Sequence, residues 1–135
     1  ERLARWTDAD LASAAGTTEI VRNRLKIKAV VTNARAAIAL TESGPGLSQF
    51  LWDFVDGQPV QNQWQRHGDV PAETPLSREL SRELKRRGFT FVGPTICYAF
   101  MQAVGMVNDH LVSCFRHEAC RHLGAGFGGP GRDSF

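Results

Sequence analysis

The sequence predicts an all-α fold of about six helices in one domain. Apolar residues recur at the helical period in several segments, and glycines, prolines and cap residues separate these segments. The sequence shows no convincing strand pattern and no internal repeat. The 135 residues include 42% hydrophobic and 22% charged residues, which is the composition of one globular domain with a buried core.

The first third of the chain predicts two helices joined by a tight turn. Thr7 and Asp10 have the spacing of an N-cap and a first-turn acid, so we expect a helix over about residues 8–15. The second helix is expected to begin near residues 21–23 and to end at the Gly and Pro residues of positions 43–46. One amphipathic stripe marks this helix: Ile27, Val30, Val31, Ala34 and Ile38.

The middle of the chain predicts a short apolar helix over residues 47–55, a loop over residues 56–74 and a further helix. Thr74 and Pro75 supply the cap and the first turn of that helix. Gly88 supplies its C-terminal stop. The apolar face of this helix is expected to consist of Leu76, Leu80 and Leu84.

The last third predicts two more helices and a tail. Residues 94–107 are apolar on nearly every side, so we expect the most buried element here, and Phe100→Ala should cost about 3–5 kcal/mol. Asn108–Asp109 is a candidate cap for a last helix over residues 110–123. Residues 124–135 are Gly-rich and are expected to form a disordered tail.

Composition excludes some classes of protein and leaves others open. No apolar run is long enough to cross a membrane, and no leader segment is expected. Three cysteines argue against a disulfide framework and favour a reducing, cytoplasmic location. The net charge of +2 permits a nucleic-acid partner without requiring one. Basic residues cluster at positions 22–28 and 82–87, which is typical of a nucleic-acid contact or of solvated helix faces.

A metal site is one candidate for chemistry. His110 and Cys114 are four residues apart on the expected last helix, so their side chains would share one face, as two ligands of a Zn²⁺ ion do. The alternative is a capping histidine and a buried cysteine. A closed site needs two more ligands from elsewhere. His117, Cys120 and His122 follow, but we favour them less.

A helix-hairpin-helix element is the second candidate, over about residues 8–40. The turn at residues 17–20 would direct backbone N–H groups and the start of the next helix at a DNA phosphate. Many helix pairs have this shape, so a structural helix junction is the alternative. Basic side chains beside the turn would add sequence-independent attraction.

No acid–base pair or nucleophile can be identified. Tyr98, Cys97 and Gln102 could line a pocket, although a core position with satisfied polar atoms is the simpler interpretation of Tyr98 and Cys97.

Three strings together resemble the DNA-3-methyladenine glycosylase I family. They are IVRNRLKIKAVVTNARAAI, FLWDFVDGQP and LKRRGFTFVGPTICYAFMQAVGMVNDH, the last followed by Cys114. The resemblance runs from about Leu3 to Cys114. It implies an all-α helix-hairpin-helix DNA glycosylase, with a partial helical domain over residues 1–123 of this chain.

The resemblance implies a site that this chain holds only in part. Two zinc ligands of the family fall on His110 and Cys114, and the other two belong to an N-terminal segment with no match here. The base-recognising Glu and the stacking Trp of the family lie in that same segment. The hairpin contacts to DNA would fall on a set that includes a Glu where the family usually has Gly: Thr18, Glu19, Ile20, Arg22 and Lys26. Tyr98 is the candidate for a remaining wall of the base pocket.

The implied activity is base-excision repair. The family flips 3-methyladenine out of alkylated double-stranded DNA and hydrolyses its N-glycosidic bond. The family needs structural zinc and no organic cofactor, and we expect a monomeric full protein that is not membrane-bound. These 135 residues alone are expected to be inactive. The alternative is a non-catalytic zinc- or DNA-binding module that kept the scaffold and lost the active site.

Overall fold

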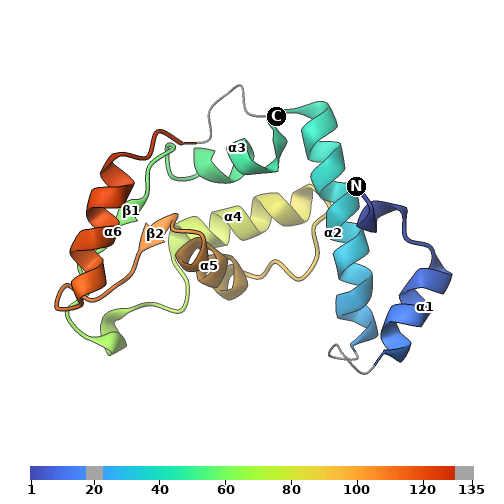
Figure 1. Ribbon diagram of the computed structural model, residues 1–135, viewed down its shortest axis with the longest axis horizontal. Helices are drawn as coiled ribbons and strands as arrows, with labels where there is room; N and C mark the ends of the chain where they lie inside the picture. The colour runs from blue at the N-terminus through green and yellow to red at the C-terminus, as the bar shows by residue number, and fades with distance from the viewer. Residues whose placement is uncertain (18–22, 130–135) are drawn as a thin grey trace. The chain divides into compact units, whose positions relative to one another are not determined.

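Six α-helices make up most of the described part of the chain, and the sequence predicts about six (Figure 1). The computed structural model describes residues 1–17 and 23–129. The expectation of no strand is wrong, because β1 (Val60–Gln61) pairs in parallel with β2 (Val107–Asn108). Two residues are too few for alternation to appear in a sequence. No helix in the described part of the chain is long and apolar enough to cross a membrane.

The chain forms two compact units. Unit 1 comprises residues 1–47 and 82–92, and unit 2 comprises residues 48–81 and 93–135. Lys and Arg number eleven in unit 1 against six Asp and Glu, a net charge of +5. Unit 2 has five against eight, a net charge of −3. The small net charge of the whole chain therefore conceals a strong separation of charge between the two units.

The helices of unit 1 begin at side-chain caps. In α1 (Asp8–Gly16) the predicted cap is confirmed: the Thr7 hydroxyl accepts from the Asp10 N–H, and the Asp10 carboxylate accepts from the Thr7 N–H at 2.7 Å. The helix α2 (Arg24–Ser43) follows Asn23, whose side-chain oxygen accepts from the Lys26 N–H at 3.1 Å. These bonds satisfy N–H groups that have no partner inside the helix.

Packing within unit 1 joins α2 to the chain start. The short 3₁₀ helix η1 (Leu3–Arg5) is held by Arg35, which donates to the carbonyl oxygens of Ala4 at 2.9 Å and Trp6 at 3.1 Å. On α2 the buried residues are Ile27, Ala29, Val31 and Leu40. The predicted stripe is therefore correct at two of its positions and wrong at Val30, which is 48% exposed.

The helix α4 (Pro75–Arg86) has the predicted cap and stop. The Thr74 hydroxyl accepts from the Ser77 N–H at 3.1 Å. Gly88 has φ +88°, its N–H donates to the Lys85 carbonyl, and the Phe89 N–H donates to the Leu84 carbonyl, both at 3.0 Å. This pattern is a Schellman motif, in which a glycine adopts the left-handed conformation and satisfies the last carbonyls.

Unit 2 holds the remaining elements, whose bounds differ from the predicted ones. They are α3 (Gly46–Asp53), which begins at the boundary of the units, η2 (His67–Asp69), α5 (Pro94–Ala103) and α6 (Phe115–Ala125). The predicted helix over residues 94–107 ends early because Gly105 turns the chain at φ +78° and Val107 enters β2. The last helix begins at Phe115 rather than at His110.

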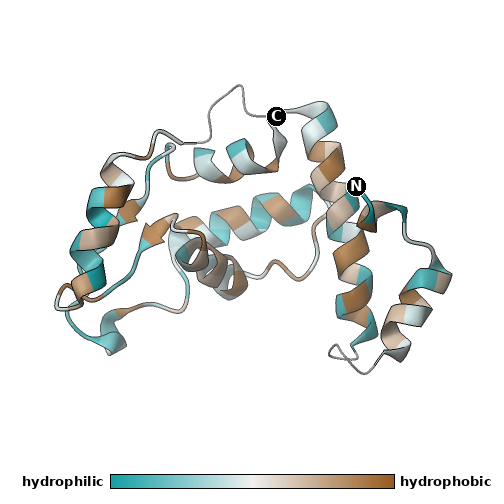
Figure 2. Ribbon diagram, in the orientation of Figure 1, coloured by the Kyte–Doolittle hydropathy of each residue, from teal (hydrophilic) through white to brown (hydrophobic). Residues whose placement is uncertain are grey.

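The helix α5 is apolar all round but is not buried all round (Figure 2). Cys97, Tyr98 and Met101 are at most 3% exposed, whereas Ile96, Phe100 and Val104 are 55%, 42% and 45% exposed. Phe100 is therefore not a core residue, and the expected 3–5 kcal/mol for Phe100→Ala is wrong. Because apolar residues lie on nearly every side of α5, the sequence alone does not show which face of this helix is buried.

The expected disordered tail is wrong for residues 124–129. The helix α6 continues to Ala125, and Gly124 is so close to β1 that an added Cβ would meet Pro59 and Gln61 side-chain atoms at 3.2 Å. The ring of Phe127 lies 4.4 Å from that of Trp52 between centroids. Residues 130–135 lie outside the described part of the chain.

Candidate functional site

One carboxylate gathers four side chains of unit 2. Asp109 directly follows β2, and its Oδ1 accepts from Asn62 Nδ2 at 2.6 Å and from Trp64 Nε1 at 2.8 Å. Its Oδ2 accepts from Tyr98 Oη at 2.5 Å and from Gln102 Nε2 at 2.8 Å. Two of the donors come from α5 and two from the segment after β1. We call these five residues the Asp109 cluster.

The Asp109 cluster carries a fixed negative charge. Burial alone would raise the pKa of Asp109, but the hydrogen bonds from Tyr98, Gln102, Trp64 and Asn62 bring that pKa below its ordinary value. Burial and the neighbouring carboxylate raise the pKa of the Tyr98 hydroxyl. At neutral pH Asp109 is thus ionised and Tyr98 is a neutral donor. The carboxylate can position its partners but is not suited to donate a proton.

The short parallel pair of strands brings the Asp109 cluster together. The Val60 N–H donates to the Met106 carbonyl at 2.9 Å, and the Asn62 N–H donates to the Asn108 carbonyl at 3.3 Å. Asn62 and Asp109 therefore leave the pair at the same end. Asn108 also connects β2 to β1 and to α6, because its Nδ2 donates to Gln61 Oε1 and to the His117 carbonyl, both at 2.9 Å.

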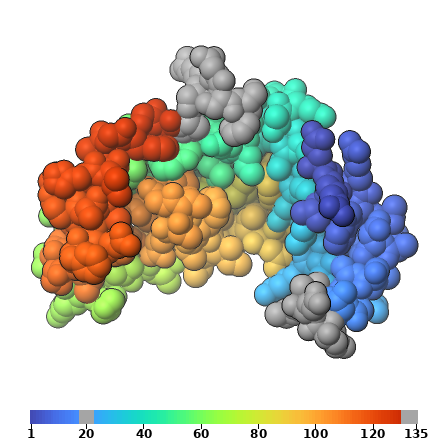
Figure 3. Space-filling view, in the orientation of Figure 1, coloured from blue at the N-terminus to red at the C-terminus, as the bar shows by residue number. Residues whose placement is uncertain are grey.

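A cavity of about 500 Å³ lies beside the cluster within unit 2. Its walls come from α3, β1, the segment from Gln102 to His110, and α6. Figure 3 shows the surface of α6 in red and that of α5 and β2 in orange. Most of the lining is apolar, and Gln102 and Asp109 of the cluster reach it. A largely apolar wall with few polar groups is typical of a small-molecule site.

The predicted metal pair lies together, but not on a helix. His110 Nδ1 is 4.0 Å from Cys114 Sγ, close to the span of about 3.6 Å between two ligands of tetrahedral Zn²⁺. Residues 110–113 form a turn, and Cys114 is the N-cap of α6, so the expected shared helix face is wrong. The described residues contain no group of three or more potential ligands. The less favoured residues are engaged elsewhere: His117 bonds the Asn62 carbonyl, and His122 pairs with Glu118.

Comparison with known proteins identifies the chain. A family model for methyladenine glycosylase matches residues 1–117. The chain belongs to the methyladenine glycosylase family. The DNA-3-methyladenine glycosylase of Haemophilus influenzae is 40% identical over 114 residues, and DNA-3-methyladenine glycosylase 1 of Escherichia coli is 42% identical over 113 residues. Both matches cover 84% of this chain but 62% and 60% of the relatives, so the chain spans about three fifths of their length.

Solved structures of the family have the same fold. A crystal structure of 3-methyladenine DNA glycosylase I has a TM-score of 0.82 and 46% identity, covering 84% of this chain and 63% of that one. A single-residue variant of 3-methyladenine DNA glycosylase I in complex with 3-methyladenine has a TM-score of 0.80 and 30% identity, covering 84% and 61%. The predicted family and fold class are confirmed.

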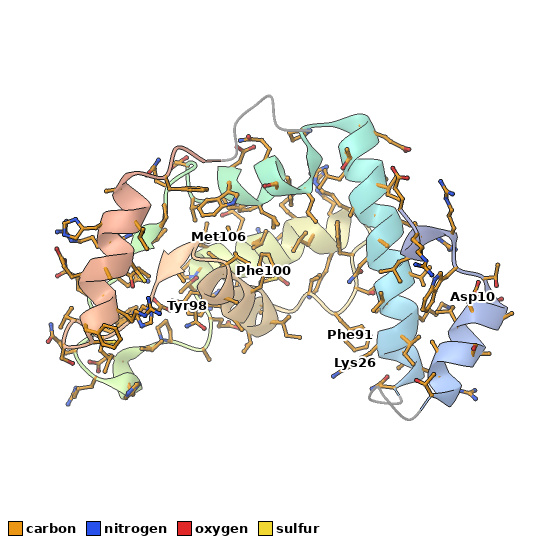
Figure 4. The ribbon with its side chains drawn as sticks, in the orientation of Figure 1. Asp10, Lys26, Phe91, Tyr98, Phe100 and Met106 are labelled. Atoms are coloured by element: carbon orange, nitrogen blue, oxygen red, sulfur yellow. The ribbon has the colours of Figure 1, made fainter. Side chains whose placement is uncertain are left out.

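In this family member Tyr98 is a core residue. Its side chain is 1% exposed, its hydroxyl is bonded to Asp109, and it does not line the cavity (Figure 4). Tyr98 thus has the core position with a satisfied hydroxyl that was the simpler interpretation, and its part in a base pocket stays a prediction. Sequence analysis had assigned Asp109 only as a helix cap, because its donors in residues 62–64 lie 45 to 47 positions away.

Most of the turn of the predicted hairpin lies outside the described residues. The helices α1 and α2 flank it, but Thr18, Glu19, Ile20 and Arg22 lie outside the described residues. Lys26 is described, and its side chain is exposed in the first turn of α2.

Proposed function

We propose that this chain is part of a DNA-3-methyladenine glycosylase that acts in base-excision repair. The observation that carries the proposal is the 40% identity to the Haemophilus influenzae DNA-3-methyladenine glycosylase over 114 residues. The structural similarity to a family member in complex with 3-methyladenine supports the same substrate class. The net charge of +5 on unit 1 fits a polyanionic partner.

The reaction is hydrolysis of an N-glycosidic bond in alkylated double-stranded DNA. The flipped 3-methyladenine carries a positive charge, so the electron pair of the breaking bond neutralises the departing base. Water supplies the new bond to the sugar carbon and loses a proton. Because the base is already a good leaving group, selective binding matters more than strong acid catalysis.

Asp109 acts in this proposal as a positioning residue. It fixes the Gln102 amide at the wall of the cavity and holds the α5 segment to the segment after β1. All four hydrogen bonds that Asp109 accepts hold these two segments together. The residues that contact the base directly are expected from the part of the relatives that this chain does not match.

Zinc is part of the proposal as a structural ion. His110 and Cys114 would hold it through Nδ1 and Sγ, and their spacing fits two of four tetrahedral ligands. When bound, the ion would fix the turn before α6 through these two ligands. DNA contacts are proposed for a helix-hairpin-helix element with Thr18, Glu19, Ile20, Arg22 and Lys26 at the phosphates.

A second function is favoured by the net charge of +5 on unit 1, which suits DNA binding without requiring release of a base. A non-catalytic zinc- or DNA-binding module would keep the fold and the charge of unit 1 without releasing a base.

The test is release of 3-methyladenine from methyl-labelled duplex DNA, measured by chromatography, alongside duplex binding by the 135-residue chain. Release above the rate of the protein-free duplex supports the glycosylase. Because the 135 residues alone are expected to be inactive, binding without release by this chain fits both functions. Release by a chimera that adds the unmatched part of the Escherichia coli relative supports the glycosylase, and binding without release by that chimera favours the non-catalytic module. Neither binding nor release overturns both.

A further inference from the structure

Phe91 has an unusual backbone conformation for an aromatic residue. Two non-glycine residues of the described chain have positive φ, Asp56 at +52° and Phe91 at +55°. Asp tolerates this region because its short side chain can bond locally, whereas a bulky side chain crowds the backbone. The Phe91 side chain is 47% exposed, so burial in the core does not account for its retention.

The segment just before Phe91 is held at two points. The Schellman motif at Gly88 fixes its start. Asn33 of α2 then clamps Thr90, because its Oδ1 accepts from the Thr90 N–H at 2.8 Å and its Nδ2 donates to the Thr90 carbonyl at 3.0 Å. Asn33, Thr90 and Phe91 all belong to unit 1. A strained residue persists where its surroundings over-determine it, and this clamp does so for Phe91.

The same loop contains a glycine at another position with positive φ. Gly88 has φ +88°, and three residues later Phe91 has φ +55° with a full aromatic side chain. Because backbone strain of this kind clusters at functional sites, it indicates a functional role for the exposed Phe91 ring.

Phe91 lies on the basic unit. Figure 4 shows the Phe91 and Lys26 side chains on the same side of α2. Lys26 is exposed, with Arg24 and Lys28 beside it in sequence and also exposed. An exposed aromatic ring and exposed cations on a unit of net charge +5 match the chemistry of nucleic acid, in which phosphates lie beside flat bases.

We infer that Phe91 is an aromatic contact of unit 1 to DNA, stacking on a base where the base stack of the duplex is opened. This inference rests on the proposed function for its DNA partner. Removing a base from the stack leaves neighbouring bases with a free face, which an aromatic ring can cover. Stacking involves no counterion release, so the contact by Phe91 differs from that by Lys26 in its response to salt.

The experiment measures binding of the 135-residue chain to two labelled duplexes by fluorescence anisotropy, from about 50 to 200 mM salt. One duplex contains a single tetrahydrofuran abasic analogue and the other is intact. The variants are Phe91→Ala, Phe91→Asn, Lys26→Ala and, as the matched control, Phe115→Ala. Asn tolerates positive φ, so Phe91→Asn keeps the loop folded. Phe115 is 83% exposed on unit 2, where the net charge is negative.

Phe91→Ala and Phe91→Asn should each weaken binding to the abasic duplex about tenfold, with a smaller loss on the intact duplex and an unchanged salt slope. Lys26→Ala should lower the salt slope by up to about one unit on both duplexes. Phe115→Ala should change neither.

If Lys26→Ala weakens binding and both Phe91 variants bind as the unaltered chain does, the inference fails and the proposed function stands. An equal loss for Phe91→Ala and Phe115→Ala also overturns it. If the unaltered chain binds neither duplex, the inference and the proposed DNA partner fail together. A tenfold loss for Phe91→Asn upholds the contact whatever the outcome of the release experiment, which tests the proposed reaction separately.

Discussion

Asp109 accepts hydrogen bonds from four side chains of unit 2. Asp109→Asn keeps the shape of the side chain but replaces one acceptor oxygen by an NH₂ group, so two donors lose their acceptor. We expect a loss of at least about 2 kcal/mol in the free energy of unfolding, measured by urea denaturation. Asp53→Asn is the control, because that exposed carboxylate accepts one bond from Gln49 and should cost under about 0.5 kcal/mol. Equal losses for the two variants would contradict the central place of Asp109.

The protonation of Asp109 gives a second prediction at this scale. Its pKa in the folded chain lies below the ordinary value, so its contribution to stability is present in full above the unfolded pKa of about 3.9 and is lost as pH falls through the folded pKa. The difference in unfolding free energy between the unaltered chain and Asp109→Asn should therefore shrink between about pH 5 and pH 2.5. A difference that grows on acidification would show that the carboxylate is not stabilised in its charged form.

At the scale of single elements, α5 offers a direct comparison of two neighbouring side chains. Met101 is 0% exposed and Phe100 is 42% exposed. We expect Met101→Ala to cost about 2–5 kcal/mol, the range for a fully buried side chain, and Phe100→Ala about 1–2 kcal/mol. Urea denaturation of both variants measures this order. A larger cost for Phe100→Ala would mean that its ring is covered in solution.

Local chemistry made some elements predictable. The starts of α1 and α4 and the end of α4 were predicted from Thr7, Thr74 and Gly88, because caps and stops depend on residues within one helical turn. The C-terminal end of α5 and the start of α6 were not, because β2 forms only against β1, far away in the sequence. The Asp109 cluster was missed for the same reason. The proximity of His110 and Cys114 was predicted correctly, but on a helix, whereas the two residues lie in the turn before α6 and at its N-cap.

For the molecule as a whole, the proposed zinc site has two of its four ligands among the described residues, His110 and Cys114. With two of four ligands, the chain should bind Co²⁺ weakly, and a thiolate-to-Co²⁺ charge-transfer band should appear only at millimolar metal. Cys114→Ala should abolish the band and Cys120→Ala should leave it, since Cys120 lies on α6 without a histidine pair. A band that disappears with Cys120→Ala instead would place the metal elsewhere.

The pairing of β1 with β2 also sets an order of events in time. Asn62 and Asp109 are 47 residues apart, and closing a loop of that length costs about 3 kcal/mol of chain entropy before any contact compensates. The helices need only neighbours and can form within microseconds. The strand pair and the four bonds of Asp109 should therefore assemble after the folding barrier. Asp109→Asn should then accelerate unfolding while leaving the refolding rate nearly unchanged. The pairing of β1 with β2 would therefore determine how long the folded chain survives rather than how quickly it forms.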